Sequence, residues 1–474
     1  MNNVSTIFGA PGCGKTTYLI EVLKEVLQHH DPNEIAFVSF TRKGSYEGRD
    51  RAMEMFGFNE EDFPYFRTIH SLAFRDLGVS RSEMLGKREY KEFSNAMGLN
   101  LLGYYTSEFL HNDDKYLFYL SMEKNNPKVA LSMLDELNYP KLMGIKAGYS
   151  KYKTAKAMLD FDDLVTEFIQ RNVPLPVEVA IIDEAQDLTS LQWEFCRVAF
   201  RDCQAVYIAG DDDQAIYEWS GADVDQFIKT ARRSNMKVLD KSYRLRSNIL
   251  EVSKRLSQKI SNRIDKVFDP VDVGGTVQYH NRLEDVTINS EESYYFLSRN
   301  NYYLSSFKEH IMKTGSMFRY KGAPSIDPAK IKAIREYEHA RQHNPGQLRD
   351  IVVNKRIKHL LRKDWVLGAV WYEAFEMTIT ENLYYRDFFK NKTDINKCSI
   401  DVSTIHGVKG GEADNVVLKL DLTKNVYANL VQGRMDEELR CLYVAMTRAK
   451  KNLHIIYPES KFGYDKIINE VKYE

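Results

Sequence analysis

The stretch Gly9-Ala-Pro-Gly-Cys-Gly-Lys-Thr16 decides the fold of the first part of this chain. It follows a short apolar run at residues 4–8 and precedes a helical pattern at residues 16–26. A glycine-rich loop between a strand and a helix presents its backbone N–H groups to phosphate oxygens. The spacing therefore predicts a phosphate-binding loop, with Lys15 reaching the β- and γ-phosphates and the Thr16 hydroxyl ligating Mg²⁺. The residues expected to bind nucleotide in this loop are Gly9, Gly12, Gly14, Lys15, Thr16 and Thr17.

Length and composition describe an ordinary globular protein of several lobes. The 474 residues are 43% hydrophobic and 28% charged, and no apolar run approaches the roughly 20 residues that span a bilayer. The N-terminus leads directly into the first expected strand, so we expect no signal peptide and a cytoplasmic location, or the host cytoplasm if the protein is virus-encoded. Five cysteines without CxxC or Cys/His spacing predict reduced thiols rather than a disulfide or zinc framework. The net charge of −1 implies that a polyanionic partner is held locally.

Short β-rich runs recur along the chain, and helical patterns separate most of them, which is typical of open parallel α/β sheets. The runs are residues 4–8, 35–40, 179–183, 205–209, 238–240, 294–298, 399–403, 415–420 and 453–456. Two mainly helical stretches, at about 74–159 and 322–397, interrupt this pattern. They predict two α/β lobes, each carrying a helical insertion.

A second phosphate-site element is Val179-Ala-Ile-Ile-Asp-Glu184, an apolar strand that ends in two carboxylates. Asp183 is expected to hold Mg²⁺ through water, and Glu184 to orient or deprotonate the attacking water. The alternative is a strand followed by an acidic helix start. After a phosphate-binding loop, the pair predicts a Mg-ATP hydrolase.

The segment Ile182-Asp-Glu-Ala-Gln-Asp-Leu188 resembles motif II of the UvrD/Rep/PcrA-like superfamily 1 DNA helicases. Further segments resemble motifs of that family in the family order: residues 159–164, 209–222, 242–244, 402–412 and 442–449. The resemblance implies two RecA-like P-loop motor domains with parallel sheets, each interrupted by a mainly helical insertion. The first motor domain would comprise residues 1–75 and 158–240, with residues 76–157 as its insertion. The second motor domain would comprise residues 241–321 and 398–474, with residues 322–397 as a reduced insertion.

The resemblance also implies the roles of individual residues in an ATP site. Gln214 would sense the γ-phosphate, while Arg244 and Arg448 would act as arginine fingers supplied by the second motor domain. Tyr243 would stack on the adenine and Glu412 would accept a hydrogen bond from the ribose. The alternatives are surface ion pairs for the two arginines and a core position for Tyr243.

A second set of residues is expected to contact DNA. Hydroxyl, imidazole and backbone groups hold phosphates, while aromatic faces stack on bases of any sequence. The candidates are Phe40, Thr41, Thr68, His70, Tyr217, Trp219, Thr404 and His406. For the aromatic residues the alternative is a place in the apolar core, and for the histidines a structural role.

Four departures from the family pattern stand out. Only eight residues precede Gly9, so the usual upstream glutamine motif for adenine is missing or replaced. Ser220 stands where the family has arginine, and Ser242 where it has asparagine. Both insertions are also short.

The sequence thus predicts an ATP-dependent DNA helicase that uses ATP and Mg²⁺, translocates 3′→5′ on single-stranded DNA and unwinds duplexes in replication, repair or recombination. Its expected partners are single-stranded DNA, junctions of single- and double-stranded DNA, and replication or repair proteins; we expect no membrane contact and a monomer in solution. One alternative is a single-strand translocase that displaces proteins with little unwinding. Another is an ATP-switched loader that binds DNA without processive movement.

Overall fold

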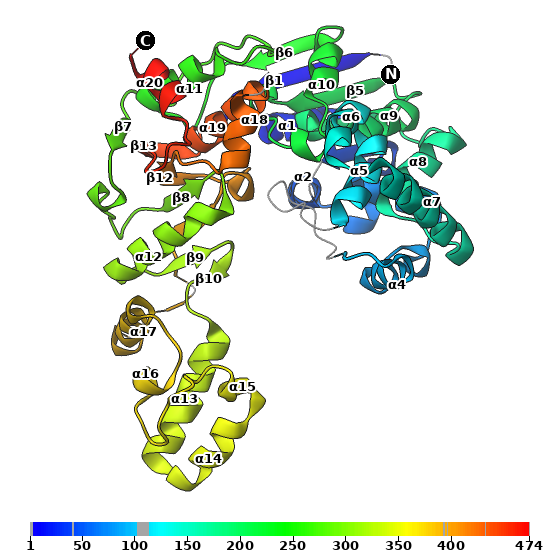
Figure 1. Ribbon diagram of the computed structural model, residues 1–474. Helices are drawn as coiled ribbons and strands as arrows, with labels where there is room; N and C mark the ends of the chain where they lie inside the picture. Colours follow the sequence, from blue (N-terminus) through cyan, green and yellow to red (C-terminus); the bar gives the residue numbers. More distant parts are fainter. Residues whose placement is uncertain are drawn as a thin grey trace. The chain divides into compact units, whose positions relative to one another are not determined.

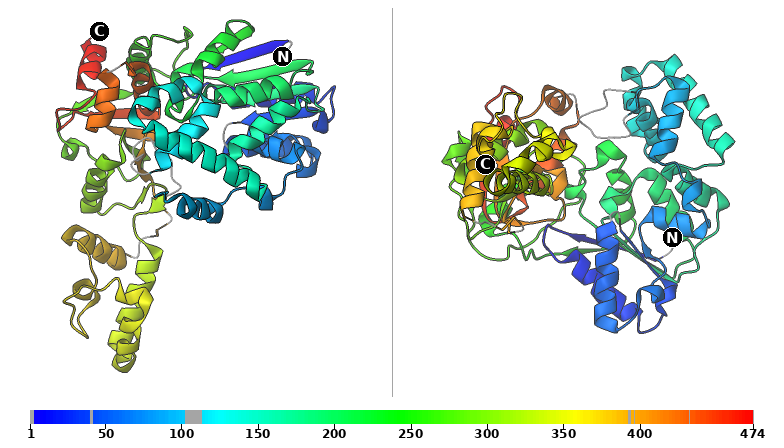
Figure 2. Two further views of the ribbon diagram at one scale, coloured as in Figure 1. Left: turned by 45° about the vertical axis from the view of Figure 1, so that its right-hand side comes forward. Right: turned by 90° about the horizontal axis from the view of Figure 1, so that it is seen from below.

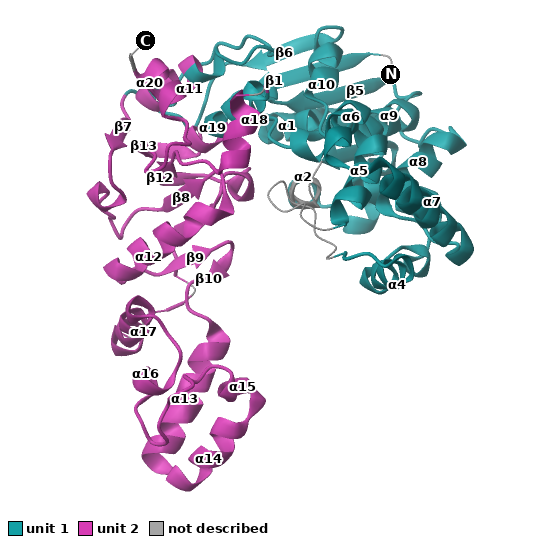
Figure 3. Ribbon diagram, viewed as in Figure 1, with its two compact units in different colours: residues 1–247, 256–273, 434–443 teal, residues 248–255, 274–433, 444–474 magenta. Residues whose placement is uncertain are grey.

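The computed structural model describes residues 3–39, 42–101, 113–391, 394–395, 397–431 and 433–473. The chain forms two compact units, shown in teal and magenta in Figure 3. Unit 1 comprises residues 1–247, 256–273 and 434–443, and unit 2 comprises residues 248–255, 274–433 and 444–474. The boundary between the units falls within helices α11 (Ser247–Ser257) and α19 (Met435–Met446).

Unit 1 contains a six-stranded sheet in the order β3-β2-β4-β5-β1-β6, and all its strand pairs are parallel. The strands are β1 (Val4–Gly9), β2 (Ile35–Ser39), β3 (Phe66–Arg67), β4 (Val179–Asp183), β5 (Ala205–Gly210) and β6 (Asn235–Leu239). Since the strands are parallel, their carboxyl ends share one edge of the sheet. This edge is where ligands bind in open α/β sheets.

Both faces of this sheet are covered by helices because its strands alternate between two apolar cores. Ile7, Phe37 and Ile181 pack with helix α1, whereas the next residues of the same strands, such as Phe8 and Ile182, belong to the core on the opposite face. Such strands read as continuous apolar runs, which is why the sequence predicted them. The helices of the α/β part are α1 (Lys15–Val26), α2 (Arg42–Phe56), α3 (Ile69–Asp76), α8 (Phe161–Arg171), α9 (Ser190–Ala199) and α10 (Val224–Ala231).

The segment between α3 and α8 is helical, as expected, and has its own core built around Phe93, Tyr116 and Leu142. Its helices are α4 (Lys87–Met97), α5 (Asp114–Asn125), α6 (Pro127–Met133) and α7 (Tyr139–Lys156). In the right-hand view of Figure 2 the cyan helices of this insertion lie on one side of unit 1 and the blue helix α1 on the other.

Unit 2 contains a seven-stranded sheet in the order β10-β9-β11-β8-β12-β13-β7, in which only β10 and β9 pair antiparallel. The strands are β7 (Thr276–His280), β8 (Tyr294–Ser298), β9 (Phe318–Tyr320), β10 (Ala323–Pro324), β11 (Ile400–Thr404), β12 (Ala413–Lys419) and β13 (Ala449–Ile456). Its helical insertion runs from α13 to α17 (Figure 1). The helices of the unit are α12 (Leu304–Thr314), α13 (Pro328–His343), α14 (Pro345–Val353), α15 (Lys355–Lys358), α16 (Trp371–Ala374), α17 (Ile379–Asn391), α18 (Lys424–Val431) and α20 (Asp465–Tyr473).

The predicted fold class, two parallel α/β sheets with helical insertions, is confirmed. Unit 1 also includes residues 241–247, 256–273 and 434–443, which the motif resemblance assigned to the second motor domain. The four-part division of the chain stays a prediction. Among the described helices, none combines the length and apolar character needed to cross a bilayer.

Candidate nucleotide and DNA site

The loop between β1 and α1 has the conformation that its glycines allow. Gly12 has a φ of +73°, a value that other residues rarely adopt. A Cβ atom added at Gly12 would lie 2.3 Å from the Cβ of Arg244, so the backbone of Arg244 packs directly against the loop. At the start of α1, the Lys15 ammonium donates a hydrogen bond to the Gly9 carbonyl at 3.0 Å. The Lys15 side chain thus folds back on the first residue of the loop.

The loop is joined to the end of strand β4. The Thr16 hydroxyl donates a hydrogen bond to Asp183 Oδ2 at 3.1 Å, and the backbone N–H of Glu184 donates to Asp183 Oδ1 at 2.8 Å. Glu184 has a φ of +53°, an uncommon backbone conformation for a residue with a side chain. Such strain is often kept where a side chain must point in a particular direction, here at the carboxyl edge of the sheet.

The charges at this edge are strongly coupled. Burial and the neighbouring carboxylate of Glu184 raise the pKa of Asp183 to about 7. Burial alone would lower the pKa of Lys15, but Cys13, Glu184 and Asp211 together raise it above its ordinary value. The site therefore holds a protonated Lys15 beside the carboxyl groups of Asp183 and Glu184, which repel each other when both are ionised.

A chain of hydrogen bonds connects Glu184 with the end of strand β5. The side-chain amide of Gln186 donates to the Glu184 carboxylate and accepts from the backbone N–H of Asp211 at 3.0 Å. The Asp211 carboxylate in turn accepts from the side-chain amide of Gln214 at 2.6 Å. The structure therefore brings together Glu184 and Gln214, two of the residues predicted for ATP hydrolysis.

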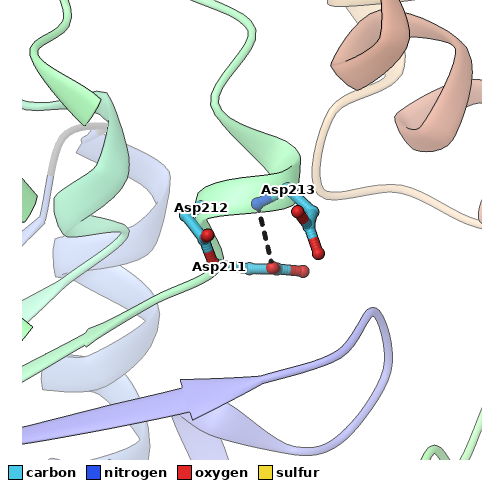
Figure 4. Close-up of side chains that lie close together, drawn as sticks. All are labelled: Asp211, Asp212 and Asp213. Atoms are coloured by element: carbon cyan, nitrogen blue, oxygen red, sulfur yellow. Dashed lines mark hydrogen bonds between the residues drawn. The ribbon is translucent and has the colours of Figure 1, made fainter. Parts of the chain in front are cut away.

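Three consecutive buried carboxylates, Asp211, Asp212 and Asp213, follow strand β5 (Figure 4). The Lys266 ammonium contacts all three, at 2.8 Å from Asp211 Oδ1 and 3.0 Å from Asp213 Oδ2. Arg263 binds both oxygens of Asp213, with its Nε at 3.0 Å and Nη2 at 2.8 Å. We refer to these five residues as the buried ion cluster.

A further buried arginine, Arg440, contacts the same segment. It donates to the Asp212 carbonyl at 3.0 Å, to Glu218 Oε1 at 2.5 Å and to the Asn262 carbonyl at 2.7 Å. Sequence reasoning missed Lys266, Arg263 and Arg440. The first two lie in Asn262-Arg-Ile-Asp-Lys266, which has no local pattern that distinguishes it from a solvent-exposed turn.

The segment after strand β6 is tied to the phosphate loop by two hydrogen bonds. The Ser242 hydroxyl donates to the Pro11 carbonyl at 2.8 Å, and the backbone N–H of Tyr243 donates to the Gly12 carbonyl at 2.8 Å. The Tyr243 side chain is 67% exposed, so it is not a core residue. Tyr243 and Arg244 both belong to unit 1.

Unit 2 contains the other two residues predicted for the ATP site. Arg448 is buried and donates to the carbonyls of Val444 at 3.0 Å and Gly411 at 3.1 Å. Glu412, which follows Gly411, is exposed, and its Oε1 lies 3.7 Å from Lys450 Nζ. The structure thus links the two motifs that carry Arg448 and Glu412 within one unit.

Four of the DNA candidates lie in the described part of unit 1. Thr68 immediately precedes helix α3, and His70 in that helix makes an edge contact with the exposed ring of Phe161. Burial lowers the pKa of His70, against the opposing effect of Asp162. Burial, with Asp187 and Glu184 adding to it, raises the pKa of Tyr217 to about 12. Trp219 packs against the apolar core of the helical insertion.

The remaining DNA candidates are distributed between unit 2 and the undescribed residues. Thr404 ends strand β11, and its hydroxyl accepts a hydrogen bond from the N–H of Gly407 at 3.3 Å; His406 begins the turn that follows. Phe40 and Thr41 lie outside the described residues.

A phosphate loop, a strand-ending aspartate bonded to its threonine and a following glutamate define the class of P-loop nucleoside triphosphatases. The chain belongs, within that class, to the UvrD-like helicases. Residues 1–235 match the UvrD/REP helicase N-terminal domain, and residues 399–456 match the UvrD-like helicase C-terminal domain.

Similar proteins carry helicase names. The ATP-dependent DNA helicase Rep of Buchnera aphidicola subsp. Schizaphis graminum is 21% identical to this chain. The alignment covers 98% of this chain and 92% of that helicase. ATP-dependent DNA helicase PcrA of Bacillus subtilis is 25% identical over 58% of this chain, and ATP-dependent DNA helicase Rep of Escherichia coli is 26% identical over 52%. The last two alignments each cover 40% of the relative, so over these matches the chain corresponds to less than half of the longer protein. Among solved structures, an arterivirus nonstructural protein 10 helicase aligns with 96% of this chain and 59% of its own, at 11% identity and a TM-score of 0.35, which is too low to carry a structural argument.

Proposed function

We propose that this protein is an ATP-dependent DNA helicase that moves along single-stranded DNA and unwinds duplexes. The observation that carries the proposal is the bond between Thr16 and Asp183, which joins the phosphate loop to a strand ending in two carboxylates. Family membership supports the assignment of this site to a helicase motor, since the relatives are named ATP-dependent DNA helicases.

Each residue of the phosphate site has a proposed role in ATP binding or hydrolysis. The loop N–H groups and Lys15 hold the phosphates, and Glu184 accepts a proton from the attacking water. Gln214 would detect the γ-phosphate, and its bond to Asp211 supports this role because it fixes the direction of the amide.

The residues present fit a magnesium ion. Mg²⁺ prefers oxygen ligands, and Thr16 Oγ1 and Asp183 Oδ2 lie 3.1 Å apart. Burial, and after it the neighbouring Glu184 carboxylate, raises the pKa of Asp183, so a cation at this place would relieve both effects. Thr16 and Asp183 would hold the ion, the latter through water. When bound, Mg²⁺ would neutralise charge on the phosphates.

Two arginines, one tyrosine and one glutamate are the remaining residues proposed to contact the nucleotide. Arg244 is a candidate for contacting the γ-phosphate because its backbone packs on Gly12, and the exposed ring of Tyr243 is available for stacking on the adenine. The assignments of Arg448 as a second arginine finger and of Glu412 as a ribose contact rest on motif resemblance.

The proposed track is single-stranded DNA, bound by Phe40, Thr41, Thr68, His70, Tyr217, Trp219, Thr404 and His406. The motif resemblance also supports four further parts of the proposal. These are movement in the 3′→5′ direction, action at junctions with duplex DNA, replication or repair proteins as partners, and a monomeric state. A cytoplasmic location belongs to it as well.

The test is ATP hydrolysis by the purified protein with single-stranded DNA, with RNA and with no polymer, run beside unwinding of duplexes with a 3′ or a 5′ tail. Stimulation by single-stranded DNA and unwinding of the 3′-tailed duplex are expected. DNA-stimulated hydrolysis without unwinding would indicate a translocase instead. ATP-dependent DNA binding without hydrolysis would indicate a loader.

A further inference from the structure

Lys266 is a fully buried lysine whose ammonium group lies among three carboxylates. It contacts Asp211, Asp212 and Asp213, and all four side chains have an exposed fraction of 0%. With Arg263 bound to Asp213, the buried ion cluster pairs three acidic groups with two basic ones. Lys266 lies 54 residues from Asp212 in sequence, so this is a tertiary contact rather than a local one.

The three carboxylates are close enough together to suggest a cation site, because one oxygen from each lies within 4.8 Å of the others. The Lys266 ammonium occupies that position, and the backbone N–H of Ile264 donates to Asp212 Oδ2 at 2.7 Å. The lysine therefore takes the place that a metal ion would fill.

The cluster is bonded to the groups proposed for ATP hydrolysis through one residue. The Asp211 carboxylate accepts from Lys266 with Oδ1 and from Gln214 with Oδ2, at 2.8 Å and 2.6 Å. The Asp211 backbone donates to Gln186, which in turn bonds to Glu184. The position of the Asp211 carboxylate thus bears on the orientation of Gln214, whereas Glu184 is linked to the Asp211 backbone.

We propose that Lys266 is a positioning residue for ATP hydrolysis, which holds the Asp211 carboxylate so that Gln214 points at the reacting phosphate. The inference rests on the proposed function. Lys266 itself touches neither nucleotide nor water in this role; it acts through Asp211.

Stability alone is a weak reason for this arrangement. Burying ions carries a large desolvation cost, and well-packed apolar residues often replace a buried ion cluster with no loss of stability. What an apolar replacement does not supply is a fixed direction for the Asp211 oxygens. Fixed donors and acceptors around a reacting group are how enzymes hold catalytic geometry.

The test separates positioning from stability by restoring the charge balance without the lysine. Lys266→Met alone leaves the carboxylates under-compensated and is expected to lower the melting temperature. The double variant Lys266→Met with Asp212→Asn removes one positive and one negative charge, and the amide introduced by the second substitution keeps an oxygen for the Ile264 N–H. We expect the double variant to regain the melting temperature and to bind a fluorescent ADP analogue as the wild type does, while its kcat for DNA-stimulated ATP hydrolysis stays about 10- to 100-fold low.

Lys153→Met provides the matched control. Lys153 bonds to two carboxylates in the same unit, at 2.7 Å from Asp160 and 2.5 Å from Asp163, and lies outside the proposed site. We expect it to lose stability and to keep its kcat.

Three results would overturn the inference. If the double variant regains kcat together with stability, Lys266 is structural only, and the proposed function stands. If Lys153→Met lowers kcat as much as the double variant does, the effect is a general one of lost stability. If the wild type itself hydrolyses no ATP with any polymer, the proposed function fails and the inference fails with it.

Discussion

The Thr16 hydroxyl lies 3.1 Å from Asp183 Oδ2, although 167 positions separate the two residues in the sequence. This bond unites the phosphate loop and the carboxyl end of strand β4. The two parts of the proposed Mg-ATP site are therefore held together inside unit 1.

Replacing Asp183 with asparagine should stabilise the protein without nucleotide and abolish ATP hydrolysis. The raised pKa means that folded Asp183 keeps its proton at pH values where the unfolded chain has lost it. Wild-type stability relative to Asp183→Asn should thus fall as the pH rises from 3.8 to about 7, and then level off. The total change should be about 4 kcal/mol, measured by urea unfolding across this range. A pH-independent difference between the two proteins would contradict the assignment.

Gly12→Ala should weaken nucleotide binding, because the added methyl group clashes with Arg244 in addition to straining the backbone. The new methyl group would meet the Cβ of Arg244 at 2.3 Å and displace the segment that carries Tyr243. Gly98→Ala is the matched control, since Gly98 has a φ of +63° with no atom within 4 Å of an added Cβ. Both variants should lose about 1 kcal/mol through strain. Only Gly12→Ala should also lose binding of a fluorescent ADP analogue; equal binding by the two variants would argue against the contact with Arg244.

Arg448→Lys should distinguish a role in phosphoryl transfer from a structural one. Lysine keeps the charge but lacks the forked guanidinium that reaches both the Gly411 and the Val444 carbonyls. If Arg448 is an arginine finger, kcat should fall about a thousandfold while affinity for ATP changes little. A lower melting temperature with normal kcat would indicate that Arg448 only joins the two motifs within unit 2.

Trp219 packs on the helical insertion, so its substitution should affect stability as well as DNA binding. Trp219→Ala is expected to lower stability and to weaken binding of single-stranded DNA by about tenfold, the value of one stacked base. Trp219→Phe retains an aromatic face and should recover most of both. Fluorescence anisotropy with labelled oligonucleotides measures the affinity. Unchanged affinity in folded Trp219→Ala would assign the residue to the core alone.

The sequence predicted the central strands because each is a buried apolar run, and most of them lie next to a recognisable motif. Strands β3 and β10, with two residues each, are too short to have a pattern, and the exposed edge strand β7 lacks an apolar run. The phosphate loop and Asp183 could be predicted because their chemistry depends on local order. The contacts of Lys266, Arg263 and Arg440 could not, since a basic residue has the same local appearance on the surface and in a buried ion cluster.

The most direct test of a DNA-stimulated motor with Glu184 as its base is the rate of ATP hydrolysis by Glu184→Gln with and without single-stranded DNA. The variant keeps the size of the side chain and one oxygen that can accept from Gln186, but it cannot accept a proton from water. We expect DNA-stimulated hydrolysis in the wild type, and in the variant normal ATP binding with kcat reduced by about 100-fold or more. Undiminished turnover in Glu184→Gln would contradict the assignment of the base. A wild type without DNA-stimulated turnover would contradict the motor itself.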